Sequence, residues 1–518
     1  WMTKLAMRNL SISALVLTLF ACSEPATYDL LLRGGTIIDG SNSPSFSGDV
    51  AIIGDRIAAV GDLDASSATV ELDVSGLVVA PGFINIHSHA EAEGLPTAVN
   101  MLSQGVTSEI INADGAGALD LPAQLSPLER AGLAINVGAM IGFNSVWRDV
   151  VGLEEVRPSS NQIQTMQTLV QEGLESGAWG VSAGLDYVPG YYATTDEVIQ
   201  ILSPFARWNT VFANHDRVTP ESSFSSIAGM SETLAIGEAA GLIPLVTHMK
   251  LQGWEQGRAS TILGRMSETP TSFTGGATAD VYPYLAGQTG LQSLIIPSWA
   301  QAGGRDTMLA RFRDPALRAQ IITEAEQAMR LRFGGHQGVY LMQSQRELTV
   351  AMQQLELDSP GEAVIQLLEE SGQGIIARFG LEEDLIEIMQ HPTASIACDC
   401  GASTSERTHP RYWGSYPKVL GEYVREKQQL SLENAIYKMS GLPAKTIGMS
   451  DRGVIRPGML ADITVFDPET VIDHATYDNP TLLSDGIIHT LVNGQIAWSN
   501  GATTNIQSGR ILRRSPPP

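Results

Sequence analysis

Two histidines separated by one residue, His87 and His89, follow a short apolar run in "GFINIHSH". Side chains alternate between the two faces of a strand, so both imidazoles project to the same side. Such a pair can hold one metal ion, because neutral imidazole nitrogen is a common ligand of zinc. A single histidine at a strand end is more often structural, so the interpretation depends on which residues accompany the pair.

Further candidate ligands stand at the ends of three more apolar runs. His215 ends "TVFANH", His248 ends "IPLVTH" and Asp399 ends "ASIACD". The five remaining histidines lie outside such runs. Four imidazoles and a carboxylate that converge in one cavity predict a site for a divalent ion such as zinc, whose bound water can lose a proton near neutral pH.

The elements that must bring these residues together lie in residues 81–449, where short strand-like runs alternate with amphipathic stretches of helical period. Eight strands, each followed by a crossover, predict an α/β protein with a (β/α)8 barrel, in which functional side chains gather at the carboxyl ends of the strands. The predicted strands are 82–89, 106–114, 134–142, 178–185, 210–216, 243–249, 277–284 and 394–399. The interval between the last two is too long for an ordinary crossover, so we expect an insertion at about residues 286–392.

Both chain ends have a residue pattern that differs from that of residues 81–449. Residues 28–80 and 450–510 contain short Ile/Val/Leu runs between Gly, Asp and Ser residues, which is typical of small strands. Asn493-Gly494 is a strong signal for a hairpin turn. We therefore expect one small β-sandwich domain formed by both chain ends.

The composition limits the classes of function that are compatible with this chain. With 518 residues, 43% hydrophobic and only 17% charged, the chain can bury a large core. The formal charge of −24 argues against nucleic acid as a partner, because phosphate binding needs a basic surface. A small-molecule substrate fits better than a charged polymer.

Residues 1–22 have the layout of a secretory signal peptide, with Lys4 and Arg8 ahead of a short apolar run that ends in Cys22. This end resembles a bacterial lipoprotein processing site. We therefore expect an exported protein, periplasmic or lipid-anchored at a bacterial membrane, that touches the membrane only through such an anchor. The other cysteines, Cys398 and Cys400, are too close in sequence to be good disulfide partners, so we expect them to be packed and inert.

Several longer motifs carry a family resemblance. "VVAPGFINIHSHAE", "LVTHMK", "DVYPYLAGQT", "ACDCGAS", "THPRYWGSYPKVLGEYVRE" and "DRGVIRPGMLADITVFDP" resemble the amidohydrolase superfamily. "HPRYWGSYPKVL" is typical of one branch, the N-acyl-D-amino-acid deacylases (D-aminoacylases). The similarity runs from about Tyr28 to about Trp498.

The resemblance implies a metal-dependent hydrolase that cleaves the amide bond of N-acyl amino acids, D-configured in this branch, with one or two Zn²⁺ ions. His87, His89 and Asp399 would form one metal position, and His215 and His248 the other. Asp399 would also be the catalytic base and acid, which takes a proton from the attacking water and passes it to the leaving amine. The remaining implied roles concern the substrate carboxylate, which Arg411 would clamp with help from Lys250 and Tyr282.

Two positions depart from the branch. Where the branch has a metal-binding Cys after the second strand, this chain has "NADG", so Asp114 takes the matching place, with Glu109 as the nearest alternative. A carboxylate is a harder donor than a thiolate and changes the metal preference of the site. Gln288 stands where the branch has a Ser that touches the substrate.

Alternatives remain within and outside the superfamily. Hydantoinases and other cyclic amidases use a carboxylated Lys after the fourth strand, and "AWGVSAGLDY" contains no Lys, which weakens that interpretation. A dipeptidase or another amide or ester hydrolase on the same scaffold is an alternative enzyme. A lipid-anchored binding or structural protein with a degenerate barrel is the non-enzyme alternative.

Overall fold

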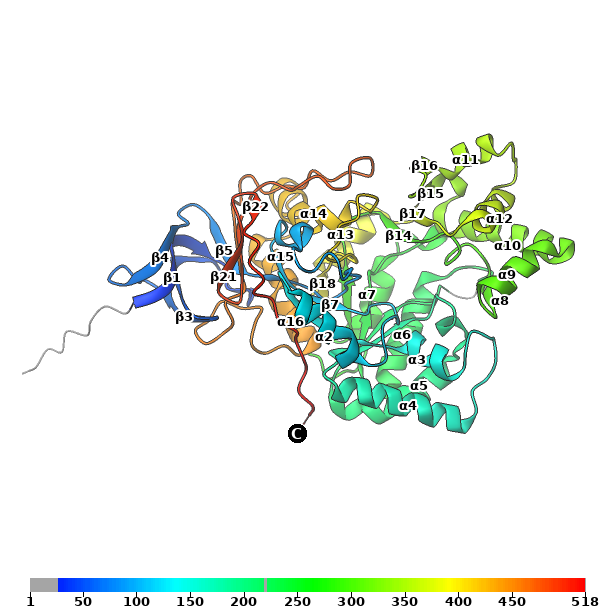
Figure 1. Cartoon of the computed structure of the whole chain (residues 1–518), viewed down its shortest axis with the longest axis horizontal. Coiled ribbons are helices and arrows are strands. Elements are labelled where there is room, and N and C mark those ends of the chain that lie inside the picture. The colour runs from blue at the N-terminus through cyan, green and yellow to red at the C-terminus, as the bar shows by residue number, and fades with distance from the viewer. Residues whose placement is uncertain (1–26, 219–220, 518) are drawn as a thin grey trace, which may run out of the picture.

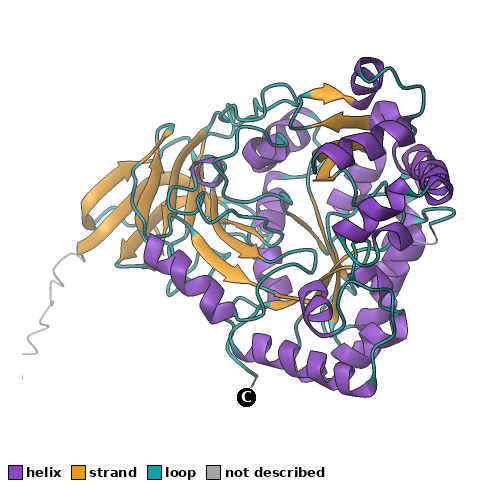
Figure 2. Ribbon diagram, turned by 45° about the vertical axis from the view of Figure 1, so that its right-hand side comes forward, coloured by secondary structure: helices purple, strands orange, loops and turns teal. Residues whose placement is uncertain are grey.

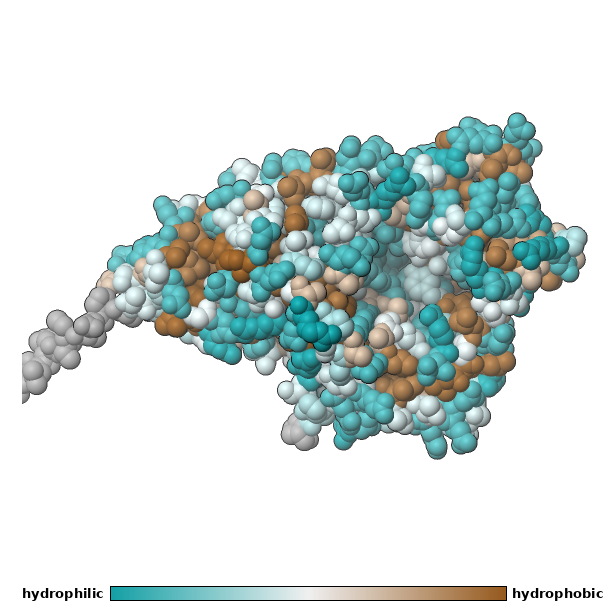
Figure 3. All heavy atoms as spheres, viewed as in Figure 1, coloured by the Kyte–Doolittle hydropathy of each residue, from teal (hydrophilic) through white to brown (hydrophobic). Residues whose placement is uncertain are grey.

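The computed structural model describes residues 27–218 and 221–517. The predicted signal peptide and Cys22 lie outside the described residues. Figure 1 shows three parts along the length of the molecule: a β-rich part built from the two chain ends, a central barrel, and a part formed by an insertion. The space-filling view shows the surface hollowed where the insertion meets the barrel (Figure 3).

The β-rich part is one continuous sheet. Eight of its nine strands follow the order β22-β21-β20-β19-β5-β1-β2-β3, and the ninth, β4, pairs with β1. The two chain ends join where β5 runs antiparallel to β19. The strands are β1 (Thr27–Ile37), β2 (Phe46–Ile53), β3 (Arg56–Gly61), β4 (Ser67–Asp73), β5 (Val78–Pro81), β19 (Ile463–Phe466), β20 (Ile487–Val492), β21 (Gln495–Ser499) and β22 (Ala502–Thr503).

The predicted hairpin turn at Asn493-Gly494 is confirmed. It connects β20 to β21, and both residues have positive φ, 49° and 80°. Two successive residues of positive φ are what a type I′ turn requires, which is why Asn followed by Gly is favoured there.

The central part contains eight strand positions. Six strands pair in the order β18-β13-β12-β11-β10-β9, and three more pair in the order β6-β7-β8. Because a single residue separates β8 from β9, these two strands count as one position. A parallel bridge between Ser88 and Cys400 connects the open ends, so the ring closes. Each of the eight predicted segments contains one position: β6 (Phe83–Asn85), β7 (Val106–Ile111), β8 and β9 (Asn136–Ala139, Ile141–Gly142), β10 (Gly180–Gly184), β11 (Val211–His215), β12 (Ile243–Val246), β13 (Thr278–Val281) and β18 (Ala394–Ile396).

Helices cover the outside of this ring (Figure 2). Two of them begin with a capping box, at Ser159 with Gln162 and at Thr194 with Glu197, which satisfies free N–H groups of the first turn. The helices are α1 (Val99–Leu102), α2 (Leu121–Ala131), α3 (Phe143–Val150), α4 (Ser160–Glu175), α5 (Thr195–Leu202), α6 (Ser226–Ala240), α7 (Ala259–Glu268), α13 (Glu382–Gln390), α14 (Arg411–Lys418), α15 (Leu432–Met439) and α16 (Gly441–Ile447). Shorter turns are η1 (Gly190–Tyr192), η2 (Ser203–Trp208), η3 (Gly253–Glu255) and the π-helical η5 (Val419–Glu426).

The insertion has its own hydrophobic core, separate from that of the barrel. It consists of β14 (Ala286–Gly290), α8 (Ser298–Gln301), α9 (Arg305–Arg313), α10 (Pro315–Phe333), η4 (His336–Gly338), β15 (Val339–Leu341), β16 (Arg346–Glu347), α11 (Leu348–Gln354), α12 (Pro360–Glu370) and β17 (Gly374–Arg378). The predicted boundary at residue 392 is too late, because α13 packs against α7 and β18 of the barrel. The insertion ends after β17.

The last described residues close the floor of the barrel. After β22 the chain leaves the small sheet, and Ile511 bridges to Val137 of β8. The buried Leu512 joins the apolar cluster inside the ring. Within the two described segments, no helix combines the length and the apolar character needed to cross a bilayer.

Candidate metal centre

The predicted histidines and Asp399 meet at the carboxyl ends of the barrel strands. His87 and His89 follow β6, His215 ends β11, His248 lies two residues beyond β12, and Asp399 lies three beyond β18. The Asp399 Oδ1 atom is 3.4 Å from His87 Nε2 and 3.1 Å from His89 Nε2. The His215 and His248 rings are in contact, with centroids 4.4 Å apart.

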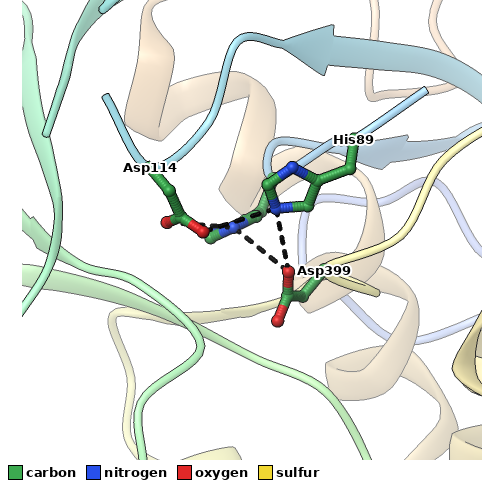
Figure 4. Close-up of side chains that lie close together, drawn as sticks. His89, Asp114 and Asp399 are labelled. Carbon is green, nitrogen blue, oxygen red and sulfur yellow. Dashed lines mark ion pairs between the residues drawn. The ribbon is translucent and has the colours of Figure 1, made fainter. Parts of the chain in front are cut away.

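Asp114 lies in the middle of these side chains. Its Oδ1 atom is 3.5 Å from His87 Nε2 and 3.6 Å from His248 Nε2. Its Oδ2 atom is 3.4 Å from His89 Nε2 and 3.8 Å from His215 Nδ1. Figure 4 shows Asp114, His89 and Asp399 pointing toward one another from three different segments of the chain.

These atoms form two groups that can each hold a metal ion. One consists of His87, His89, Asp114 and Asp399, the other of Asp114, His215 and His248, and the potential ligand atoms of each group lie within 4.8 Å of one another. Asp114 belongs to both groups, so its carboxylate would be a ligand in either of them. Glu109, the alternative to Asp114, belongs to neither group, and its Oε2 accepts a hydrogen bond from the Ala402 N–H.

Three buried ligand atoms of these groups are available to a metal ion, because they have no hydrogen-bond partner among the described residues. These atoms are His87 Nε2, Asp114 Oδ1 and His215 Nδ1. Buried polar atoms are nearly always hydrogen-bonded, and exceptions at a cluster of ligand-type atoms indicate an ion. Imidazole nitrogen together with carboxylate oxygen suits zinc.

The electrostatics of the site favour a cation. Burial disfavours the imidazolium of His87, yet the neighbouring carboxylates, Asp280 first among them, hold its pKa well above the usual value. The negative potential that retains a proton on a buried ring also attracts a divalent ion. Burial and the adjacent ammonium of Lys250 hold the pKa of His248 well below its usual range, which keeps that ring neutral as a ligand must be.

The chain turns sharply at the ligands themselves. Asp114, His248 and Asp399 have positive φ values of 54°, 34° and 49°. Residues other than Gly rarely adopt this conformation, and such residues cluster at functional sites. It ends the alternation of each strand and aims these side chains into the mouth of the barrel.

Asp280, near the end of β13, is a residue of the site that the sequence pattern did not predict. Its Oδ2 lies 3.3 Å from His87 Nδ1, and its Oδ1 accepts a hydrogen bond from the His248 N–H at 2.6 Å. Asp280 therefore orients one candidate ligand through its ring and another through its backbone. The available signal was an Asp within a predicted strand, in "TADVYPY".

A contact between the insertion and the barrel mouth was not predicted either. Arg332 of α10 donates to both carboxylate oxygens of Asp186, at 2.8 and 3.1 Å, and both side chains are buried. Asp186 Oδ2 lies 3.8 Å from His215 Nε2. No sequence pattern connects positions 186 and 332.

Arg411 begins α14 and reaches Asp399. Its Nη1 donates to Asp399 Oδ2 at 2.6 Å, and its guanidinium lies over the Tyr282 ring, 5.0 Å from the centroid. Burial opposes ionisation of Asp399, but the charges of Arg411 and the nearby imidazoles lower its pKa below the ordinary value. The carboxylate is therefore ionised.

Lys250 lies on the same side of the site. Its Nζ is 2.8 Å from His248 Nδ1 and 4.9 Å from the centroid of the Phe379 ring. Lys250, Tyr282 and Arg411 all line one cavity of about 510 Å³, together with His89, Asp114 and Asp399. Gln288 lines it too, and its Oε1 accepts a hydrogen bond from the His409 N–H. A larger cavity of about 870 Å³, also lined by Phe379, contains none of the candidate ligands.

The prediction for the two cysteines is wrong. Cys398 and Cys400 form a disulfide around Asp399. A straight strand would hold residues two apart too far from each other, but the positive φ of Asp399 turns the chain and brings the two Cα atoms to 5.0 Å, within the usual range for a disulfide. Both sulfurs are buried, and the bridge encloses the backbone of Asp399.

Comparison with known proteins gives a consistent result. The profile described as "Amidohydrolase family" matches residues 395–497. D-aminoacylase from Alcaligenes xylosoxydans xylosoxydans is 33% identical, and the match covers 95% of this chain and 99% of that protein.

Solved structures agree over nearly the whole chain. N-acyl-D-glutamate deacylase from Bordetella bronchiseptica, complexed with zinc and a phosphonate inhibitor, has a TM-score of 0.80 at 29% identity and covers 94% of this chain and 100% of its own. A structure of D-aminoacylase from work on the role of its binuclear metal centre has a TM-score of 0.79 at 31% identity, with the same coverage.

Replacing Asp280 tests how the ligands are oriented. We expect Asp280→Asn to weaken zinc binding about 10- to 100-fold, because an amide no longer attracts a proton on His87 Nδ1 and changes the bond to the His248 N–H. Competition with a chelator of known affinity measures the change. Asp384→Asn is the control, since this buried carboxylate accepts from the Gly257 and Ala259 N–H groups outside the metal site. Equal zinc affinity in both variants would contradict the role of Asp280.

Proposed function

The chain belongs to the amidohydrolase family that includes D-aminoacylase and the N-acyl-D-amino-acid deacylases, and we propose that it hydrolyses N-acyl-D-amino acids to a carboxylate and a free D-amino acid. It is a metal-dependent hydrolase of linear amides. One observation carries the proposal: Asp399 lies between the candidate metal ligands and Arg411, facing the same cavity. This arrangement supports a general base, a metal site and a carboxylate-binding group that act on one bond of the substrate.

The metal-binding residues of this chain suit one or two zinc ions. His87, His89 and Asp399 would hold one, His215 and His248 the other, with Asp114 between them. When bound, such an ion polarises the amide carbonyl and lowers the pKa of the attacking water. The solved N-acyl-D-glutamate deacylase contains zinc, which supports the choice of metal.

Asp399 would transfer the proton from the attacking water to the leaving nitrogen. As an ionised carboxylate it takes a proton from the attacking water and delivers it to the amide nitrogen as the C–N bond breaks. The disulfide on either side and the hydrogen bond from Arg411 hold this carboxylate in place. A fixed position matters because proton transfer needs hydrogen-bond distances to both the water and the leaving nitrogen.

Arg411, Lys250 and Tyr282 hold the other end of the substrate. All three line the cavity on one side of the metal ligands. One nitrogen of Arg411 is bonded to Asp399, whereas its buried Nε has no hydrogen-bond partner. The guanidinium can therefore contact Asp399 and a substrate carboxylate together, which orients the amide over the metal.

The structure also bears on two alternatives. A cyclic amidase would use a Lys after the fourth strand, whereas in this chain the carboxylate of Asp114, which follows β7, the second strand position, belongs to both groups of candidate ligands. A degenerate barrel without enzymatic function does not fit, because the predicted histidines and Asp399 are gathered within one site.

We also propose that the protein is exported and anchored through a lipid on Cys22. The support is the charged, then apolar, then Cys-ending pattern of residues 1–22. The substrate would then be met outside the cytoplasm.

A substrate panel tests the proposed activity. We expect hydrolysis of N-acetyl-D-amino acids at rates well above those of the L-forms, dipeptides and esters. Asp399→Asn should lower kcat about 10²- to 10⁴-fold, because proton transfer is lost. The circular dichroism spectrum should be unchanged, and zinc content measured on the same sample separates loss of the base from loss of metal. Near-normal turnover by this variant would exclude Asp399 as the base.

Substitution of Arg411 tests the carboxylate clamp. The wild type should prefer an N-acetyl-D-amino acid over its carboxamide by about 10- to 100-fold in kcat/KM, the effect of a hydrogen bond to a charged group. We expect Arg411→Ala to lose that preference and to slow both substrates, since Asp399 also loses its partner. Arg411→Lys restores the charge but not the two-pronged geometry, so it should recover part of the rate and little of the preference. A preference that persists in Arg411→Ala would assign the clamp to other residues.

Fractionation of a bacterial host that expresses the full chain tests the anchor. The wild type should sediment with membranes and incorporate labelled palmitate, whereas Cys22→Ser should do neither. Ser23→Ala is a neighbouring control that should behave as the wild type. Identical fractionation of the wild type and Cys22→Ser would contradict the anchor.

A further inference from the structure

Arg148 lines the cavity of the metal centre from helix α3. It lies four residues after Asn144, which lines the same cavity, so both side chains are on one face of the helix. The amide of Asn144 accepts from the Gly184 N–H at 3.0 Å and donates to the Gly184 carbonyl at 2.8 Å. These bonds tie α3 to the end of β10, so the cation at position 148 stands on a rigid support.

Arg148 is also a cation without a partner in the described part of the chain. Its side chain is exposed, and no carboxylate is paired with it, unlike Arg411, which is bonded to Asp399. The other cation in the cavity, Lys250, contacts His248. In a protein of net charge −24, an unpaired cation inside a substrate cavity marks a place for an anion.

The order of the strands around the ring indicates where Arg148 lies relative to the other end of the substrate. Lys250, Tyr282 and Arg411 follow the sixth, seventh and eighth strand positions of the ring, which are β12, β13 and β18. Helix α3 follows β9, the third position. In a closed ring of eight, the third position faces the seventh, so Arg148 lies across the metal centre from the carboxylate clamp.

This arrangement orients the substrate. With its α-carboxylate on the clamp and its amide over the metal ligands, the acyl chain extends toward the opposite wall, where Arg148 stands. We propose that Arg148 binds an anionic group at the far end of the acyl chain, so that the preferred substrates are D-amino acids acylated by a dicarboxylic acid, such as N-succinyl- or N-glutaryl-D-amino acids. This inference rests on the proposed deacylase function.

Matched substrates test the role of Arg148. N-succinyl-D-leucine and N-succinamoyl-D-leucine differ only in a terminal carboxylate or carboxamide. The wild type should favour the succinyl compound by about two- to fivefold in kcat/KM at low salt, the size expected of an exposed ion pair, and the ratio should fall as salt is added. The corresponding glutaryl and glutaramoyl pair allows for a longer reach.

Arg148→Gln should bring the ratio close to one and leave kcat/KM for N-acetyl-D-leucine unchanged, because the acetyl group does not reach position 148. Arg130→Gln, in the last turn of α2 and outside the cavity, should keep the wild-type ratio. Equal rates on both members of each pair in the wild type, or a preference that survives in Arg148→Gln, would overturn the inference. If the wild type hydrolyses no N-acyl-D-amino acid at all, the proposed function fails; hydrolysis of the neutral substrates without acidic preference removes only the role of Arg148.

Discussion

Compensation of buried negative charge organises the mouth of this barrel. Asp114, Asp280 and Asp399 are buried or nearly so within reach of one histidine, His87. Carboxylates removed from water are costly unless cations accompany them. Arg411 compensates Asp399 directly, and the rest of the negative charge, together with neutral imidazoles, is what a divalent ion requires. The same balance keeps Asp399 ionised beside the candidate metal ligands.

The surrounding parts supply rigidity to this site by different means. Asp280 fixes a ring and a backbone amide of two ligands, the disulfide encloses Asp399, and the ion pair of Arg332 with Asp186 connects the insertion to the neighbourhood of His215. Each of these contacts fixes a side chain of the candidate site, where a misplacement of about 1 Å would slow a reaction strongly. The insertion is therefore part of the active-site wall as well as a cover.

The two opposite sides of the cavity are lined by different residues, so its two ends differ. Lys250, Tyr282 and Arg411 follow three successive strand positions, while the Asn144 face of α3 lies across the ring. Under the proposed function, a substrate with its carboxylate on the clamp would bind in one sense, with its acyl part against the third strand position. Recognition of the acyl group would then be separated in space from recognition of the amino acid.

Much of this architecture was predictable from the sequence, because strand periodicity and histidines at strand ends are local patterns. They were enough for the eight strand positions and for His87, His89, His215, His248 and Asp399. Asp114 came from the resemblance to the deacylase branch, in which a metal-binding Cys takes the matching place. The central position of Asp114, the support from Asp280, the Asp186 to Arg332 ion pair and the disulfide were decided by tertiary structure. Left-handed residues at the strand ends redirect side chains in ways that alternation does not anticipate, and ring closure brings together residues that are distant in sequence and share no local pattern.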